Sequence, residues 1–216
     1  MSGLAFPSTR ASLLLRGLRL EYLTVGWNLV EGVVAVAAGL AAGSIALIGF
    51  GLDSFVESFS GSVLIWRLRA EQRLADLAGV ERIEDRARRL VAVSFVVLAT
   101  YITLDAVLAL VGQERPAASP VGIVITSVSI GVMWWLARVK RETAIALGSR
   151  ALLHDAMQTA ACWWLSLVVL VGIGLNAVLG WWWADPVAAL GIAFLLFREA
   201  REAWEGEGSS EGAEHD

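Results

Sequence analysis

Two carboxylates stand four residues apart in a stretch of the chain that is otherwise apolar or small. Asp53 and Glu57 lie within residues 45–66, and on a helix this spacing places both on one face, about one turn apart. A carboxylate inside hydrocarbon is costly unless it pairs, takes a proton or faces water. Two of them repel each other unless a cation or a proton lies between them. The pair therefore predicts a site that binds cations or protons.

A second apolar stretch, residues 151–178, carries Gln158 and Cys162, also four residues apart. If the two stretches are membrane-spanning helices that run in opposite directions, Asp53 and Cys162 both lie roughly 16–18 Å above the cytoplasmic end. Glu57 and Gln158 then both lie roughly 10–12 Å above it. Two pairs of donors at matching depths can close a tetrahedral cage of the kind that Zn²⁺ prefers. The predicted metal site consists of Asp53, Glu57, Gln158 and Cys162.

The donor types leave the identity of the metal open. Carboxylate and amide oxygens suit harder ions such as Mn²⁺, whereas a Cys162 thiolate favours softer ions such as Zn²⁺ or Cd²⁺. Gln158 has the alternative role of a hydrogen bond between helices, and Cys162 that of a small buried apolar side chain. We expect no permanent cofactor, only a transported divalent cation, with Zn²⁺ as the first choice and Mn²⁺, Cd²⁺ or Fe²⁺ as alternatives.

Four further polar residues lie near this set in the predicted helices. His154 and Asp155 are closer to the cytoplasmic end of their stretch, where they are solvated, form an entry relay or act as additional metal ligands. Asn28 and Glu31 belong to an earlier apolar stretch, at roughly the depth of the predicted metal site. These two residues either bond neighbouring helices to one another, contribute an additional ligand or take a proton.

The elements that must position these residues are membrane-spanning helices. The chain of 216 residues is 57% hydrophobic with a mean hydropathy of +0.66, which is too apolar for the surface of a water-soluble domain. A spanning helix needs about 20 mostly apolar residues. Six stretches meet this need, namely 20–42, 45–66, 90–112, 119–138, 151–178 and 182–198. We predict an all-α membrane protein, a bundle of six transmembrane helices.

The predicted bundle, residues 20–198, leaves a short segment at each end. Residues 1–19 are expected to form a cytoplasmic segment, and residues 199–216 an acidic, disordered cytoplasmic tail. At the start of the sixth helix, Asp185 precedes Pro186. This order is typical of a helix N-terminus, so Asp185 is expected to cap the sixth helix rather than to bind metal.

The distribution of basic residues predicts the orientation. Of the 17 Lys and Arg residues, all but Arg115 fall at the two ends of the chain and in the second and fourth loops between the predicted helices. Because cytoplasmic segments carry the excess of Lys and Arg, both termini are expected in the cytoplasm. No signal-peptide pattern precedes the first helix. We therefore expect a multi-pass protein of the inner (plasma) membrane.

Several function classes conflict with the composition. One Cys and two distant His residues can build neither a disulfide framework nor a soluble zinc module. The net charge of −4 comes largely from the tail and argues against a nucleic-acid partner. We find no nucleophile with its own base and no H-E-x-x-H motif, so we expect that the protein is not an enzyme.

Four segments of the chain carry a resemblance to a known family. They are residues 28–32 (Asn-Leu-Val-Glu-Gly), residues 44–54 continuing to Glu57, residues 153–159, and residues 182–186 (Trp-Trp-Ala-Asp-Pro). Together they resemble the cation diffusion facilitators, six-span exporters of divalent metals. The resemblance covers roughly residues 20–200, and its motifs recur in the corresponding helices.

The resemblance implies metal export by alternating access in exchange for protons, by a homodimer in the lipid bilayer. In typical members, two polar residues of the second helix and a His and an Asp of the fifth helix bind the metal. By position these fall on Asp53, Glu57, Gln158 and Cys162, so Gln and Cys replace His and Asp. Typical members also end in a cytoplasmic domain, whereas only residues 199–216 follow the last predicted helix. We therefore expect a divergent, transmembrane-only member.

Two other functions stay open on the sequence. The first is a proton-coupled carrier of a small organic cation, which would use the same carboxylates without a metal. The second is a membrane scaffold that does not transport and whose metal site is degenerate, as the Gln and Cys of the fifth helix would suggest.

Overall fold

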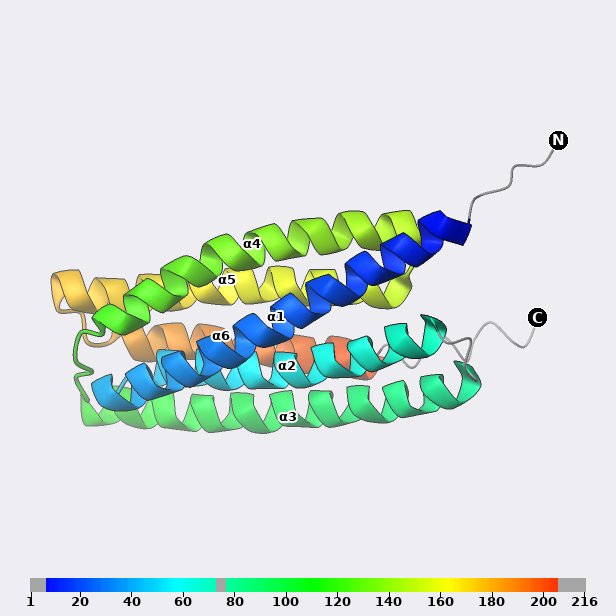
Figure 1. The fold of residues 1–216 in the computed structure, drawn as a ribbon. Coiled ribbons are helices and arrows are strands. Elements are labelled where there is room, and N and C mark those ends of the chain that lie inside the picture. The colour runs from blue at the N-terminus through cyan, green and yellow to red at the C-terminus, as the bar shows by residue number, and fades with distance from the viewer. Residues whose placement is uncertain (1–6, 73–76, 206–216) are drawn as a thin grey trace.

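The computed structural model of the chain describes residues 7–72 and 77–205, and the side chains of 7–9, 71–72, 77–85, 87, 88 and 205 lie outside this description. The described residues form six helices and no strand (Figure 1). The helices are α1 Pro7–Ala42, α2 Ile45–Gln72, α3 Leu77–Gly112, α4 Pro120–Leu147, α5 Arg150–Leu179 and α6 Ala184–Glu205. The prediction of an all-α bundle of six helices is confirmed.

Five of the described helices, α1 to α5, are long and apolar enough to cross a membrane. α6 has a shorter apolar run, between Asp185 at its start and Arg198 near its end. This run corresponds to the shortest of the six predicted spans. The long apolar helices identify a multi-pass membrane protein.

Several helices are longer than the predicted spans. α1 begins at Pro7 instead of residue 20, α3 at Leu77 instead of residue 90, and α4 ends at Leu147 instead of residue 138. Hydropathy marks only the part of a helix that crosses hydrocarbon, whereas the backbone ladder continues until a cap ends it. α4, for example, ends where Gly148 adopts the left-handed conformation, as is usual at a helix C-terminus.

The predicted division at residue 199 is wrong for the first part of the tail. Residues 199–205 continue α6 as regular helix, so they are not disordered. The remainder of the predicted tail, residues 206–216, lies outside the described residues. Most of the predicted N-terminal segment likewise belongs to α1.

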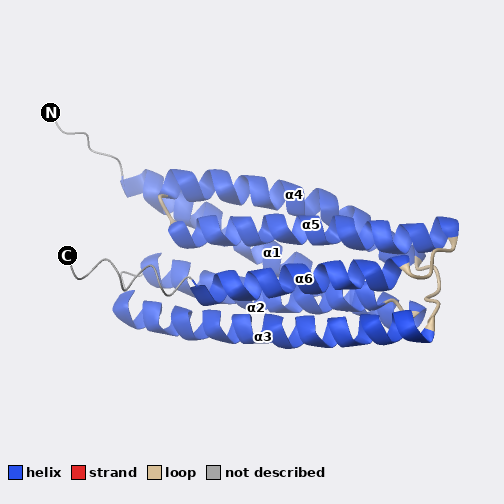
Figure 2. Cartoon of the chain, turned by 180° about the vertical axis from the view of Figure 1, so that it is seen from behind, coloured by secondary structure: helices blue, strands red, loops and turns tan. Residues whose placement is uncertain are grey.

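The helices pack in three neighbouring pairs. α1 lies along α2, α4 along α5, and α3 along α6 (Figures 1 and 2). α1 also contacts α4, and α2 contacts α5, so these four helices enclose the residues of the predicted site. α1 and α2 nearly touch: a Cβ atom added to Gly51 would lie 2.8 Å from the backbone nitrogen of Val36 and 2.9 Å from the carbonyl oxygen of Gly32. Small residues permit such close approach between membrane helices.

Buried polar residues lie beside the apolar clusters of the core. One cluster includes Phe50 and Ile102, another includes Leu68 and Leu152 at the end of the bundle where α1 starts and α6 finishes, and a third includes Cys162. The inward faces of α1, α2, α4 and α5 also carry a polar layer of carboxylates, hydroxyls, an amide and an ammonium group. The candidate site lies in this layer.

Asp185 does not have the role that its position before Pro186 predicts. Its carboxylate accepts hydrogen bonds from the Ser44 hydroxyl and from the backbone N–H of Ile45, the latter at 3.0 Å. These groups belong to the start of α2, whose first N–H groups have no partner within their own helix. Asp185 therefore caps α2 rather than α6 and ties the two helices together.

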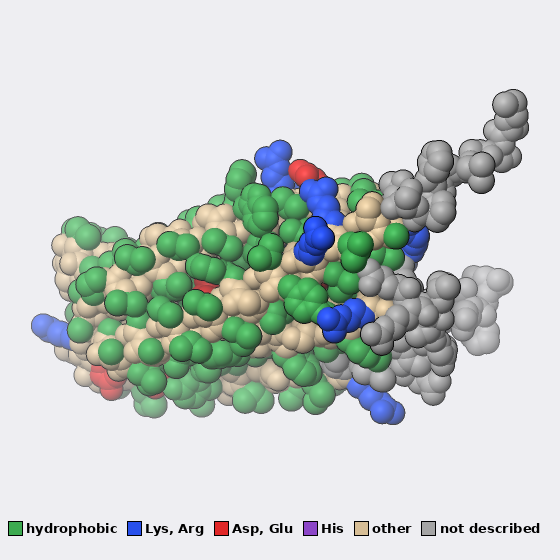
Figure 3. Space-filling view, viewed as in Figure 1, with side chains coloured by type: hydrophobic (Ala, Val, Ile, Leu, Met, Phe, Trp, Pro, Cys, Tyr) green, Lys and Arg blue, Asp and Glu red, His purple; other side chains and the backbone are tan. Residues whose placement is uncertain are grey.

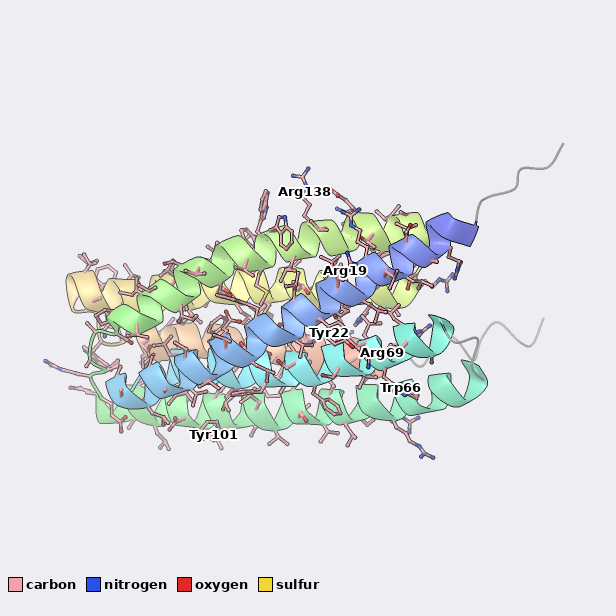
Figure 4. The ribbon with its side chains drawn as sticks, in the orientation of Figure 1. Arg19, Tyr22, Trp66, Arg69, Tyr101 and Arg138 are labelled. Carbon is pink, nitrogen blue, oxygen red and sulfur yellow. The ribbon has the colours of Figure 1, made fainter. Side chains whose placement is uncertain are left out.

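Charged side chains are unevenly distributed over the surface. In the view of Figure 3, Lys and Arg gather toward the end of the bundle where α1 begins, and apolar side chains cover most of the remaining face. Near the same end, Arg69 of α2 lies over the ring of Tyr22 of α1, with 5.3 Å between guanidinium and ring centre (Figure 4). Trp66 and Arg19 lie close by in that view. Such mixed aromatic and basic belts are typical of membrane–water interfaces.

Candidate metal site

The four residues of the predicted metal site line one small cavity in the polar layer. α2 supplies Asp53 and Glu57, α5 supplies Gln158 and Cys162, and Glu199 of α6 completes the lining. The Cys162 thiol points at Asp53, with 3.8 Å between Sγ and Oδ2. These two residues are predicted from the sequence to lie at one depth on facing helices, and the structure brings them into contact.

The cavity is closed in this conformation. It is too narrow to hold a water molecule, and among the described residues no group of three or more His, Cys, Asp or Glu side chains is arranged to hold a metal ion. Gln158 accepts a hydrogen bond from Ser60 at 3.4 Å, so its amide oxygen is engaged. The four-ligand cage therefore stays a prediction.

Glu199 is the member of the cavity that the sequence analysis missed. It was assigned to the acidic tail because it follows the last apolar run. Its place on the helix gives a signal, however, because the buried residues Ile192, Leu196 and Ala203 recur at steps of four and seven, and Glu199 lies three residues after Leu196 on that stripe. If the period of buried residues on α6 is continued past the charged Arg198, Glu199 falls on the inward face of the helix.

A larger cavity of about 840 Å³ lies beside the small one, between α2, α3, α5 and α6. The two cavities share Gln158 and Glu199 in their linings. We call the larger cavity the vestibule, because it leads from the end of the bundle where α6 finishes toward the candidate site. Its charged and polar lining residues are Ser60, Arg67, Arg150, His154, Asp155, Gln158, Arg198, Glu199 and Glu202.

His154 and Asp155, the two residues considered as a relay, have different surroundings. His154 is exposed and lines the vestibule, but it is not part of the small cavity. Asp155 also reaches the vestibule, yet its carboxylate is mostly buried and binds Lys140, with 2.5 Å between Oδ2 and Nζ. Asp155 is therefore an ion-pair partner, and the alternative that it is simply solvated is wrong.

Lys140 is a second residue that the sequence analysis placed incorrectly. The basic-residue count assigned it to a cytoplasmic loop, whereas its side chain is 0% exposed and lies inside the bundle. Its ammonium group contacts Glu21 of α1 at 3.1 Å and donates to the hydroxyl of Thr159 at 3.2 Å. With Asp155, this ion-paired cluster joins α1, α4 and α5. A charge in the bundle interior needs such partners.

The helical period would have placed Lys140 and Glu21 on the inward faces of their helices, although not their pairing. On α4 the buried residues Met133 and Leu136 are followed at a step of four by Lys140, so the inward face continues past the end of the apolar run. On α1, Glu21 lies three residues after the buried Leu18. Hydropathy averages over all faces of a helix, and for this reason it hides a single inward charge.

Asn28 and Glu31 are both fully buried on α1, as their expected depth implied. Glu31 accepts a hydrogen bond from Ser54 of α2, with 3.1 Å between Oγ and Oε2. Asn28 faces Glu57, but neither its amide nitrogen nor its amide oxygen has a hydrogen-bond partner. The bond between helices expected as one alternative is present for Glu31.

Comparison with known protein families identifies the domain that these helices form. The model of the cation efflux transmembrane domain matches residues 22–205. The chain belongs to the cation efflux family. The match begins in α1 and ends with α6, so it includes every residue of the candidate site. The resemblance inferred from the sequence motifs is thereby confirmed, and the described helices form the cation efflux transmembrane domain.

A protein of Synechocystis described as an uncharacterized transporter is similar to this chain. The two are 29% identical over 179 residues. The matched region covers 80% of this chain and 56% of the relative. The chain thus spans little more than half the length of that curated relative.

Proposed function

We propose that this cation efflux protein exports divalent metal cations, with Zn²⁺ as the first substrate and Mn²⁺, Cd²⁺ or Fe²⁺ as alternatives. One observation carries the proposal: two carboxylates, a thiol and an amide from α2 and α5 line one cavity in the buried polar layer. Carboxylate and thiolate groups are the ligands of divalent metals. Glu199 adds a third carboxylate to the same lining.

The proposed mechanism is alternating access with exchange of metal for protons. Metal ligands must be deprotonated, so metal binding displaces protons from Asp53, Glu57 and the Cys162 thiol. Protonation of the same groups on the opposite side of the membrane then weakens the site and releases the ion. The vestibule supports this mechanism, because it adjoins the cavity at Gln158 and Glu199 and extends toward one end of the bundle. With both termini in the cytoplasm, as proposed from the basic residues, that end faces the cytoplasm.

Transport by reconstituted protein tests the proposal. Asp53→Ala is expected to abolish Zn²⁺-driven proton flux in liposomes, since it removes the carboxylate that contacts Cys162. Asp105→Asn is the matched control, because this α3 carboxylate lies beside Tyr101 and outside both cavities. Full retention of flux by Asp53→Ala would show that the site is assigned to the wrong residues.

Glu199 provides an independent test of the site. Glu199→Gln keeps the size of the side chain and removes one charge from the lining of both cavities. We expect the apparent Kd for Zn²⁺ to rise about tenfold, which corresponds to about 1.4 kcal/mol. The neighbouring Glu202 lines only the vestibule, so Glu202→Gln serves as the control, and equal effects of the two changes would contradict the role of Glu199.

The size of the vestibule favours a small organic cation as the second candidate substrate. A volume of about 840 Å³ with Phe95 and Trp164 in its lining falls in the range of small-molecule sites, and aromatic rings bind organic cations. Calorimetric titration with Zn²⁺, Mn²⁺ and a quaternary ammonium ion separates the two functions. Binding of the organic cation without any binding of metal would support the carrier.

We further propose a homodimer in the inner (plasma) membrane. Light scattering of the detergent-solubilised protein measures the mass of the assembly, and a monomer at all concentrations would contradict the homodimer. Labelling of a Cys introduced beside the exposed Arg10, in a Cys162→Ser background, tests the orientation in intact cells. Reaction with an impermeant reagent would contradict a cytoplasmic N-terminus.

A further inference from the structure

Unpaired polar atoms are concentrated in one buried region between α1, α2 and α4. In the described part of the chain, all but one of the buried side-chain nitrogen and oxygen atoms without a hydrogen-bond partner belong to Trp27, Asn28, Glu31 and Glu57. Asn28 and Glu57 have no partner at either of their polar atoms. An unsatisfied buried polar group costs about 1–3 kcal/mol, and more if it is charged. Such a concentration points to a ligand rather than to packing.

The oxygen atoms of this region converge from three helices. Asn28 and Glu31 lie about one turn apart on the inward face of α1, and the Asn28 amide faces Glu57 of α2. Glu31 contacts the Ser54 hydroxyl and faces Ser129 of α4. We call these five residues the α1 polar cluster. Its oxygen ligands are one amide, two carboxylates and two hydroxyls, with no sulfur or imidazole among them.

The α1 polar cluster carries buried negative charge that a bound cation would balance. Glu31 and Glu57 are 0% and 3% exposed, and two buried carboxylates repel each other. The buried cation nearest in the layer, Lys140, is already engaged by Glu21 and Asp155. The cluster therefore has two carboxylates and no basic side chain of its own.

We propose that the α1 polar cluster, where Asn28 and Glu31 of α1 face Glu57 and Ser54 of α2, is a binding site for an alkali cation such as Na⁺. Oxygen-only ligands select hard cations, and a thiolate selects softer ones. Mg²⁺ does not suit the cluster, because it usually keeps several waters, for which a closed, fully buried site has little room. The alkali site is distinct from the cavity at Cys162, and the two share Glu57.

The shared Glu57 links the two ions. An alkali ion held by Glu57 withdraws a carboxylate from the metal, so each ion lowers the affinity of the other by the same factor. This consequence rests on the proposed metal transport, whereas the alkali site itself does not.

Thermal unfolding of the full chain tests the alkali site. Salt is varied at constant ionic strength by replacing choline chloride with NaCl, KCl or LiCl. A cation that binds only the folded state raises the Tm with concentration. We expect this rise for the wild-type protein and for Asp105→Asn, whose carboxylate lies on α3. In Asn28→Ala and in Ser54→Ala, which leave every carboxylate in place, the apparent Kd for the cation is expected to rise at least about tenfold.

Direct binding of ²²Na⁺ to the purified protein provides a second measurement that does not depend on unfolding. A Tm that responds equally to choline and alkali salts, or only to pH, together with no bound ²²Na⁺, would overturn the proposal. Failure of the metal proposal is distinguishable, because Asp53→Ala is expected to lose Zn²⁺ binding and keep the alkali effect. Loss of the alkali effect in Asp105→Asn would also overturn it, since that residue lies outside the cluster.

Discussion

Replacement of Lys140 by Met gives the sharpest test of how the buried charges are held. The ammonium group contacts Glu21 at 3.1 Å and Asp155 at 2.5 Å, and the side chains of Lys140 and Glu21 are both 0% exposed. Met has a similar length and no charge, so Lys140→Met preserves most of the packing. It leaves two carboxylates facing each other without a cation.

The expected loss of stability in Lys140→Met follows from this geometry. Removing one partner of a buried ion pair costs about 3–5 kcal/mol, because the other charge stays buried and uncompensated. For a chain of this size, about 1 kcal/mol corresponds to roughly 2–4 °C in Tm. We therefore expect Lys140→Met to lower the Tm by roughly 6–20 °C. The change Arg138→Met, at an exposed residue one half-turn away on α4, is expected to change the Tm little.

A thermal-unfolding assay in detergent measures these shifts, and a triple variant tests the cause. When Glu21→Gln and Asp155→Asn are combined with Lys140→Met, no buried charge is left unpaired, and an uncompensated buried charge is the main cost of breaking such a pair. We expect the triple variant to recover most of the lost Tm. A Tm of Lys140→Met close to that of the wild type, or a triple variant less stable than the single one, would refute this account of the cluster.

Three further predictions concern single positions. Asp185→Ala removes the acceptor at the start of α2 and is expected to lower the free energy of unfolding by about 1–2 kcal/mol, with an unchanged Tm as the contradicting result. Gly51→Ala places a Cβ against the backbone of α1 and is expected to cost about 1–3 kcal/mol, whereas Gly131→Ala, which meets open space, is the control and should cost nothing measurable. Cys162→Ser replaces the soft thiol ligand by a hard hydroxyl. The ratio of Cd²⁺ to Mn²⁺ affinity is expected to shift by about tenfold or more toward Mn²⁺. An unchanged ratio in calorimetry would exclude the thiol from the site.

The sequence alone determined the number of helices and the facing of α2 and α5. Both follow from local properties: apolar length marks a helix that crosses hydrocarbon, and a step of four residues places two side chains on one face. Asp53 and Cys162 could be matched in depth because the rise of a helix is constant. For this reason their contact at 3.8 Å agrees with the prediction.

Only the tertiary structure decided which helix each polar side chain contacts. Asp185 precedes its own helix in sequence but caps α2, and Lys140 lies beyond an apolar run but is buried against Glu21 and Asp155. Glu199 likewise joins the candidate site from α6. These partners are far apart in sequence, so no local period links them. Their pairing depends on how whole helices pack, and the cost of an unpaired charge in the interior then selects the partners.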